Sequence, residues 1–246
     1  TGYGTDGTIW GGEFLLGDAN GFERMAHFEP MPLPGGEAAI KSPWRIGLSY
    51  LHQVFDSNLP DSPALKDRDI QPIIQMLDAN INSPLTSSCG RLFAAVAALS
   101  GGRQEIRYEA QAAIEFMQVA QNELGKDYSI FAPTLTDGKY IIPIKSVLEN
   151  LLSRIDTGRN VSQLSQWFHN SLIHTFVRIC EELRSEKGIE KIVLSGGVFQ
   201  NRLLFEGLLA GLAQKGFSTF THQQVPCNDG GLALGQVAIG LKYLQK

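Results

Sequence analysis

Three glycine-rich turns carry residue types that could hold a phosphate group. They read TGYGTDG at 1–7, SGGVFQN at 195–201 and NDGG at 228–231, and each lies at the end of an expected strand or the start of an expected helix. Backbone N–H groups converge on phosphate at such turns, and a helix N-terminus adds partial positive charge. None matches the Walker A pattern or the GxGxxG fingerprint. Each alone is more often structural; several together indicate a nucleotide held from two sides.

Two asparagines and an aspartate accompany the last two turns. Asn201 and Asn228 can both donate and accept hydrogen bonds, which suits a ribose or the edge of a base. Asn201 equally suits the N-cap of the helix expected after it. Asp229 is a carboxylate at a helix start, so it could be an N-cap or a metal ligand. The sequence leaves both pairs of alternatives open.

The histidines and cysteines form no recognisable metal or nucleophile motif. His169 and His174 are five residues apart, unlike an i,i+4 pair on one helix face, and the other histidines are isolated. Cys89, Cys180 and Cys227 are widely spaced and lack a CxxC motif, which argues against a disulfide framework or a zinc knuckle. Cys180 is expected in the core, and Cys227 is the one to check for reactivity. The residues favour a group transfer in which the chain positions the reactants, rather than one that passes through a covalent enzyme intermediate.

The composition limits the class of protein. The chain has 246 residues, 43% of them hydrophobic and 19% charged, which fits one large domain or two lobes. The net charge is −4, so basic residues are not in excess and we expect no nucleic-acid partner. No apolar run is long enough to suggest a membrane span, no signal peptide is visible, and we expect the cytoplasm as the compartment. The opening TGYGTDG lacks a methionine and indicates a fragment or a processed chain.

Periodicity and turn residues predict the elements that would position these turns. The expected helices begin with one capped by Ser42, followed by one at 70–79 and one that Ser87 or Ser88 could cap and that runs through 99. Further helices are expected at 106–124, 147–155, 162–185, from the end of the SGGVFQN turn to about 215, and at the C-terminus. A glycine turn and strand open the chain, a hairpin turning at Asp137-Gly138 is expected within 128–144, and strands are expected at 189–194, buried, and 216–224. The helix 162–185 should bury Phe168, Leu172, Phe176, Cys180 and Leu183. The β-α-β-α order of the last third predicts an α/β architecture with a sheet covered by helices.

Five phrases occur in the same order as in a known family. TGYGTDGTIWGGEFLL, MAHFEPMPLPGGEAA, TSSCGRLFAAVAAL, LSGGVFQNRLL and CNDGGLALGQ resemble the C-terminal carbamoyltransferase domain of HypF-type hydrogenase maturation proteins, over essentially the whole chain. That domain is similar to the catalytic subunit of the tRNA threonylcarbamoyladenosine synthase. The resemblance implies an α/β, actin-like and Hsp70-like (ribonuclease H-like) fold with two lobes. Residues 1–246 would be the C-terminal part of this domain, truncated at its N-terminus and without the upstream acylphosphatase-like, zinc-finger and adenylate-forming domains.

The resemblance also implies a reaction. Members of the family make a carbamoyl adenylate from carbamoyl phosphate and ATP, and transfer the carbamoyl group to the C-terminal cysteine thiol of HypE. The product becomes the cyanide ligand of nickel–iron hydrogenases. A HypE-type protein is therefore the expected partner, and a homodimer is left open. Carbamoyl adenylate or ATP is the expected ligand, with a divalent metal ion (zinc, iron or magnesium) in the full-length family.

Matching the motifs residue by residue implies a set of contacts with the nucleotide. The residues are Gly2 and Thr5 near phosphate, Ser88, Gly90 and Arg91 near the sugar, and Gly196, Gly197 and Asn201 near the adenosine. Asp229 matches the metal-binding aspartate. The resemblance places the paired metal histidines and a further aspartate before Thr1, so we expect weak metal binding by this chain and no full reaction. Ala94 stands where the family usually has an aspartate, which removes an acceptor for ribose hydroxyls.

Two other functions remain open from the sequence. The chain could be a non-catalytic module that binds a nucleotide or a HypE-type protein, because the metal histidines are missing and Ala94 is an alanine. It could also be an actin-like kinase for a small molecule, for which Asp6 would be the catalytic aspartate.

Overall fold

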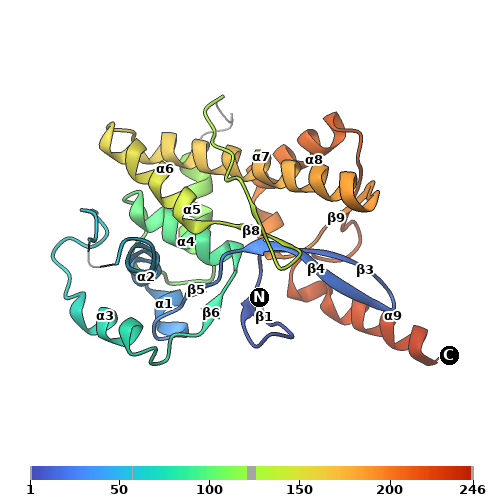
Figure 1. Cartoon of the computed structure of the whole chain (residues 1–246), viewed down its shortest axis with the longest axis horizontal. Helices are drawn as coiled ribbons and strands as arrows, with labels where there is room; N and C mark the ends of the chain where they lie inside the picture. The colour runs from blue at the N-terminus through green and yellow to red at the C-terminus, as the bar shows by residue number, and fades with distance from the viewer. Residues whose placement is uncertain (1, 57, 121–125, 245–246) are drawn as a thin grey trace.

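The computed structural model of the chain describes residues 2–56, 58–120 and 126–244 (Figure 1). Helices and strands alternate in a mixed α/β fold, as the sequence predicts. The helices α1 to α6 lie on one side of the molecule, and α8, β9, β10 and α9 lie on the other. The long helix α7 runs along both parts and packs against α5, α6 and α8.

The strands form two four-stranded sheets and one two-stranded sheet within the described residues. The first sheet has the order β1-β2-β6-β5, built from Gly2–Tyr3, Ile9–Trp10, Leu85–Thr86 and Met31–Pro32. The second has the order β3-β4-β8-β7, built from Glu13–Asp18, Gly21–Phe28, Lys139–Ile142 and Thr134–Thr136. The third pairs β9 (Lys191–Leu194) with β10 (Ser218–Thr221) in parallel. The Asp137-Gly138 turn joins β7 to β8, with φ of 49° and 75°, as the predicted hairpin requires.

The helices follow most of the predicted boundaries. They are α1 (Glu37–Lys41), α2 (Pro43–Phe55), α3 (Gln71–Asp78), α4 (Cys89–Leu99), α5 (Gln111–Val119), α6 (Ile144–Asp156), α7 (Val161–Lys187), α8 (Arg202–Gln214) and α9 (Leu232–Leu244). Short 3₁₀ turns, η1 (Gly197–Gln200) and η2 (Asp229–Gly231), precede α8 and α9. None of these helices is both long and apolar enough to cross a membrane.

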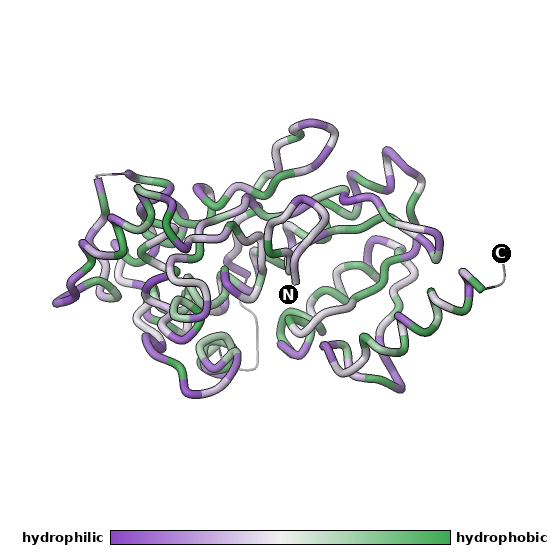
Figure 2. Tube along the Cα trace, turned by 90° about the horizontal axis from the view of Figure 1, so that it is seen from below, coloured by the Kyte–Doolittle hydropathy of each residue, from purple (hydrophilic) through white to green (hydrophobic). Residues whose placement is uncertain are grey.

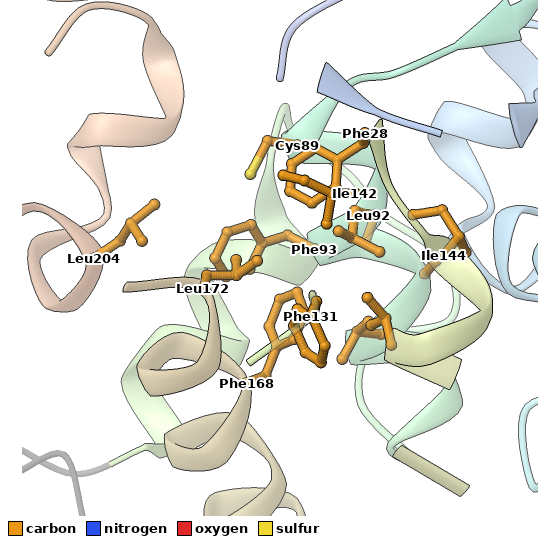
Figure 3. Close-up of a cluster of buried hydrophobic side chains, with 14 of the residues drawn as sticks. Phe28, Cys89, Leu92, Phe93, Phe131, Ile142, Ile144, Phe168, Leu172 and Leu204 are labelled. Carbon is orange, nitrogen blue, oxygen red and sulfur yellow. The ribbon is translucent and has the colours of Figure 1, made fainter. Parts of the chain in front are cut away.

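A continuous hydrophobic core joins the two parts around α7. The predicted stripe is confirmed for four of its five residues: Phe168 and Leu172 are fully buried, and Phe176 and Cys180 are nearly so. The fifth, Leu183, is only partly buried against the core. Phe93 of α4 meets Phe168 edge to face, with ring centroids 5.0 Å apart. Figure 3 shows these two rings gathered with Phe131 and Leu172, pointing toward one another. The core fixes α4 and α8, the helices whose N-termini carry predicted site residues, against one common helix.

Two predictions about the starts of helices were wrong. The helix expected from residue 106 begins only at Gln111, because the N–H of Ile106 binds the carbonyl of Lys41 and Ala110 adopts a left-handed φ of 59°. Its expected end at 124 lies outside the described residues. Ser42 precedes α2 as predicted, but its hydroxyl donates to Glu105 instead of capping the helix.

The C-terminal sheet is also less covered than expected. Only Leu194 of β9 is buried, and Val193 is exposed, because the two-stranded sheet is covered on one face alone within the described residues. The helix α9 buries none of its side chains among these residues. Figure 2 shows it reaching outward with several hydrophobic positions along its length.

Candidate functional site

The N-terminus of α4 presents an unpaired cation. Ser88 caps the helix, accepting the N–H of Arg91 at 3.4 Å, as one of the two predicted serine caps requires. The guanidinium of Arg91 is largely buried, which lowers its pKa, yet within the described ranges no hydrogen bond or ion pair engages it. A Cβ at Gly90 would have only the Oγ of Ser88 within 4 Å, at 3.7 Å, so this point faces open space. A cation beside a helix N-terminus is suited to an anionic ligand.

The first glycine turn is held by Asp6. Its carboxylate accepts hydrogen bonds from the N–H and hydroxyl of Thr8, at 3.0 and 2.8 Å, and from the indole of Trp10 at 2.9 Å. It also pairs with Arg24 at 2.9 Å. Partial burial would raise the pKa of Asp6, but these hydrogen bonds and the charge of Arg24 lower it to about 2. Asp6 is therefore a turn-forming carboxylate, which speaks against its use as the base of a kinase.

A buried ion pair joins this turn to the start of α4. Arg24 pairs with Glu13 at 2.8 Å, donates to the hydroxyl of Ser87 at 2.9 Å, and lies over the ring of Trp10. Glu13 also accepts the hydroxyl of Ser87 and the backbone N–H groups of the double glycine before it. A Cβ at Gly12 would lie 2.5 Å from the carbonyl oxygen of Ser87. The second glycine of this pair therefore lies so close to the backbone of Ser87 that a side chain would clash there.

Gly2 and Thr5 lie on the exposed side of this turn. Gly2 pairs with Trp10 in the short β1–β2 ladder, and a Cβ at Gly2 would meet nothing within 4 Å. Thr5 is exposed in the turn that follows. Their predicted contacts with phosphate stay a prediction.

The second and third glycine turns come together at the carboxyl ends of β9 and β10. The N–H of Gly196 donates to the carbonyl of Cys227 at 2.7 Å, and a Cβ at Gly197 would lie 3.8 Å from the Cβ of Asn228. Gly196 has a φ of 116°, which disfavours any other residue. Ligands of parallel sheets bind outside the carboxyl ends of the strands, so this pair of turns is a second candidate contact surface.

Asn201 and Asn228 both act as caps. Asn201 precedes α8 and its Oδ1 accepts the N–H of Leu204 at 3.2 Å, and Asn228 accepts the N–H of Gly230 at 3.0 Å. The N-cap alternative for Asn201 is therefore confirmed. Its contact with a nucleotide stays a prediction. The hydroxyl of Ser195, in the same turn, lies 3.0 Å from Nε2 of His222.

Asp229 opens η2 and is exposed. The part of the chain that the structure describes holds no group of three or more histidine, cysteine, aspartate or glutamate side chains that could bind a metal ion. A single carboxylate does not make a metal site, so the described residues do not fit a complete one. The metal role of Asp229 stays a prediction.

The predicted residues thus form two groups. Ser88, Gly90 and Arg91 lie at the start of α4 beside the first turn, and Gly196, Gly197 and Asn201 lie with Asn228 beside β9 and β10. Within residues 2–56, 58–120 and 126–244, no hydrogen bond or ion pair links one group directly to the other. Ala94 is nearly buried in α4, one turn after Gly90.

Sequence reasoning missed four residues of these surroundings. Arg24 and Glu13 lie 11 residues apart and meet Ser87 only through folding, so no local pattern could pair them. The spacing of His169 from His174 and the isolation of His222 predict no site role for either, although each contacts one of the predicted turns, through Asn201 and Ser195. A histidine on the apolar face of the predicted helix 162–185 was the available signal for His169.

Comparison with known proteins places the chain in a family. A family described as "Carbamoyltransferase, Kae1-like Domain, second subdomain" matches residues 1–236. The chain is 37% identical to carbamoyltransferase HypF of Rhodobacter capsulatus over 99% of its own length and 31% of that protein. It is 33% identical to HypF of Synechocystis over 100% of its length and 33% of that protein. A HypF homolog of Cupriavidus necator is 32% identical, over 98% of the chain and 63% of that shorter relative.

Solved structures agree with this match. A full-length HypF in a phosphate- and nucleotide-bound form is 37% identical, with a TM-score of 0.91 over 100% of the chain and 32% of that structure. HypF of T. kodakarensis is 28% identical, with a TM-score of 0.85 over 99% of the chain. The chain thus spans about a third of most of these relatives and has the two-lobed, actin-like α/β fold that its sequence predicts. It belongs to the HypF carbamoyltransferase family.

Proposed function

We propose that this chain binds the nucleotide part of carbamoyl adenylate and belongs to an enzyme that transfers the carbamoyl group to the C-terminal cysteine of a HypE-type protein. The observation that carries the proposal is the match of the whole chain, at 37% identity and a TM-score of 0.91, to about a third of a HypF solved with phosphate and nucleotide bound. The two groups of site residues add the chemistry that such a ligand needs.

The anion of the adenylate needs a cation, and Arg91 is the strongest candidate. It is largely buried and stands at the start of α4, and no hydrogen bond or ion pair within the described residues engages its guanidinium, although the nearby charge of Glu109 acts to raise its pKa. Gly90 leaves room beside it. The turn with Gly196, Gly197 and Asn201 supplies backbone and amide groups for the remainder of the nucleotide. Phosphate contact by a guanidinium is favoured because its N–H groups match the oxygen geometry.

The transfer itself requires a thiolate and a leaving group. The sulfur attacks the carbonyl carbon of the carbamoyl group, the bond from that carbon to the phosphate oxygen breaks, and AMP leaves with the electron pair. Hydrogen-bond donors near the carbonyl oxygen would stabilise the negative charge that develops there.

The cysteines of this chain support a thiol supplied by a partner. Cys89 and Cys180 are buried, and burial raises the pKa of both thiols, that of Cys180 to about 12. A thiol with a raised pKa is a poor nucleophile near neutral pH. Cys227 is half-buried, and its carbonyl accepts the N–H of Gly196.

A divalent ion would neutralise phosphate charge if one were bound. Within this chain only Asp229 is proposed for it, and no step is assigned to the ion because the described residues do not form a ligand set.

Calorimetric titration with AMP and with ATP tests the nucleotide site. We expect binding by the chain and a loss of affinity of about tenfold or more in Arg91→Ala, because a hydrogen bond to a charged group is removed. Arg159→Ala is the matched control, since Arg159 is exposed after α6 and far from the site in sequence. No heat with the unaltered chain, or equal affinity in Arg91→Ala, would contradict the proposal.

Mass spectrometry separates transfer from binding alone. The protein that contains this chain is incubated with carbamoyl phosphate, ATP and a HypE-type protein, and the partner's C-terminal peptide is examined for an added carbamoyl group. Its appearance supports the transferase. Capture of the partner without the added group favours the binding module, and a carbamoyl group on Cys227 would redirect the acceptor to this chain.

A further inference from the structure

His169 lies fully buried at the centre of α7, between the two groups of site residues. Its ring centroid is 5.1 Å from that of Phe93 on α4 and 6.0 Å from that of Phe116 on α5. Phe93 follows Arg91 by two residues, and the side-chain amide of Asn201 is hydrogen-bonded to Nε2 of the imidazole. His169 therefore contacts Asn201 directly and the start of α4 only through Phe93.

The hydrogen bonds of His169 allow only one arrangement of protons. Nδ1 lies 2.8 Å from the carbonyl oxygen of Ser165, which can only accept, so Nδ1 carries the hydrogen. In the neutral ring Nε2 must then accept, and it lies 2.8 Å from Nδ2 of Asn201. This assigns the nitrogen of the Asn201 amide toward His169 and its oxygen toward the N–H of Leu204. The cap and the histidine independently require the same orientation of the amide.

Neighbouring contacts tie three helices at this point. The hydroxyl of Ser165 donates to the carbonyl of Phe116, and the N–H of Arg202 donates to Sδ of Met117 at 3.2 Å. The start of α8 is therefore anchored to α5 and α7 next to His169. The turn that carries Gly196 and Gly197 leads directly into this anchored start of α8.

We propose that His169 is a positioning residue for the nucleotide, holding the Asn201 amide and the start of α8 at a fixed separation from the N-terminus of α4. The inference rests on the proposed function. One amide hydrogen of Asn201 is used by His169 and its oxygen by the cap, so the second hydrogen is the one offered to an oxygen of the nucleotide. His169 does not touch the ligand; it acts through Asn201.

Three substitutions separate this role from packing. His169→Gln can place an amide oxygen near the position of Nε2 and accept from Asn201, whereas His169→Asn keeps the bond to Ser165 and is too short to reach Asn201. His169→Phe fills the aromatic surroundings and keeps neither bond. The readouts are the NMR signals of the Asn201 side-chain amide, the affinity for AMP and ATP by calorimetry, and the midpoint of thermal unfolding.

We expect His169→Gln to bind within about threefold of the unaltered chain, and His169→Asn and His169→Phe to bind about three- to tenfold more weakly. The Asn201 amide hydrogens should exchange faster with water in the two weaker variants. A purely structural role would instead order the variants by thermal midpoint and leave affinity unchanged in those that remain folded. Equal affinity in folded His169→Asn, or a hydrogen found on Nε2, would overturn the inference.

The proposed function fails by a different result. If the unaltered chain binds neither AMP nor ATP, the proposed nucleotide site is wrong, and so is the proposed effect of His169 on nucleotide affinity. The NMR comparison of His169→Asn with the unaltered chain still decides whether His169 orders Asn201, because that measurement needs no ligand.

Discussion

Asp6 and His169 are each held in the protonation state that their hydrogen bonds require. Hydrogen bonds and the charge of Arg24 keep Asp6 ionised, with a pKa of about 2, although its partial burial acts the other way. Burial lowers the pKa of His169 to about 4, and its contacts with Ser165, Asn201 and the surrounding rings include no charged group. The first turn therefore needs a charge, and the link to the second turn needs a neutral ring.

The low pKa of His169 predicts a loss of stability in mild acid. As pH falls from 6.5 toward 4, the unfolded chain binds a proton that the folded chain does not, so the free energy of unfolding falls. Between pH 7 and 4.5 this residue should contribute a loss of about 2 kcal/mol. Urea unfolding at both pH values should show a smaller loss in His169→Gln.

The comparison isolates His169 because the other histidines are present in both proteins. Burial also lowers the pKa of His27 and His174, so each protein should lose some further stability in the same range. An equal loss in the unaltered chain and in His169→Gln would show that His169 is not held neutral by folding.

At the scale of elements, the start of a helix could be predicted where the residue directly before it caps it. Ser88 lies directly before α4 and Asn201 directly before α8, and both caps are present. The start of α5 could not be predicted in this way. The N–H of Ile106 is taken by Lys41, which is 65 residues away, and this contact depends on the fold.

Burial was harder to predict than helix type. The helices α8 and α9 are both rich in leucine, yet Leu208 is 2% exposed and Leu234 is 58% exposed. The difference arises because α8 packs along α7, whereas α9 contacts mainly the turn before it within the described residues. Apolar composition alone therefore does not give the packing partner of a helix. A large exposed apolar surface of this kind is typical of interaction surfaces.

The two leucines give a matched test of the packing. Leu208→Ala should lower the free energy of unfolding by about 2–5 kcal/mol, because it removes core contacts and leaves a cavity. Leu234→Ala should change it by less than about 0.5 kcal/mol. Chemical unfolding of both variants measures the difference. Equal effects would mean that α9 is packed in the free chain and that its exposed position is wrong.

At the scale of the whole molecule, the family could be identified from sequence because its motifs are long and ordered. The same motifs gave the positions of Ser88, Arg91 and Asn201. They could not give the network of Arg24, Glu13 and Ser87, since no spacing rule connects residues that only folding brings together. The core around α7 then explains how two groups without a direct hydrogen bond are kept at a fixed separation.

If the two groups form a single site, one nucleotide contacts both of them at once. Backbone NMR of the isotopically labelled chain, titrated with AMP and ATP, measures whether it does. We predict that the amide signals of Gly90, Arg91, Gly196, Gly197 and Asn201 shift together with one dissociation constant. Shifts confined to one group, or shifts that saturate at different concentrations, would contradict a shared site.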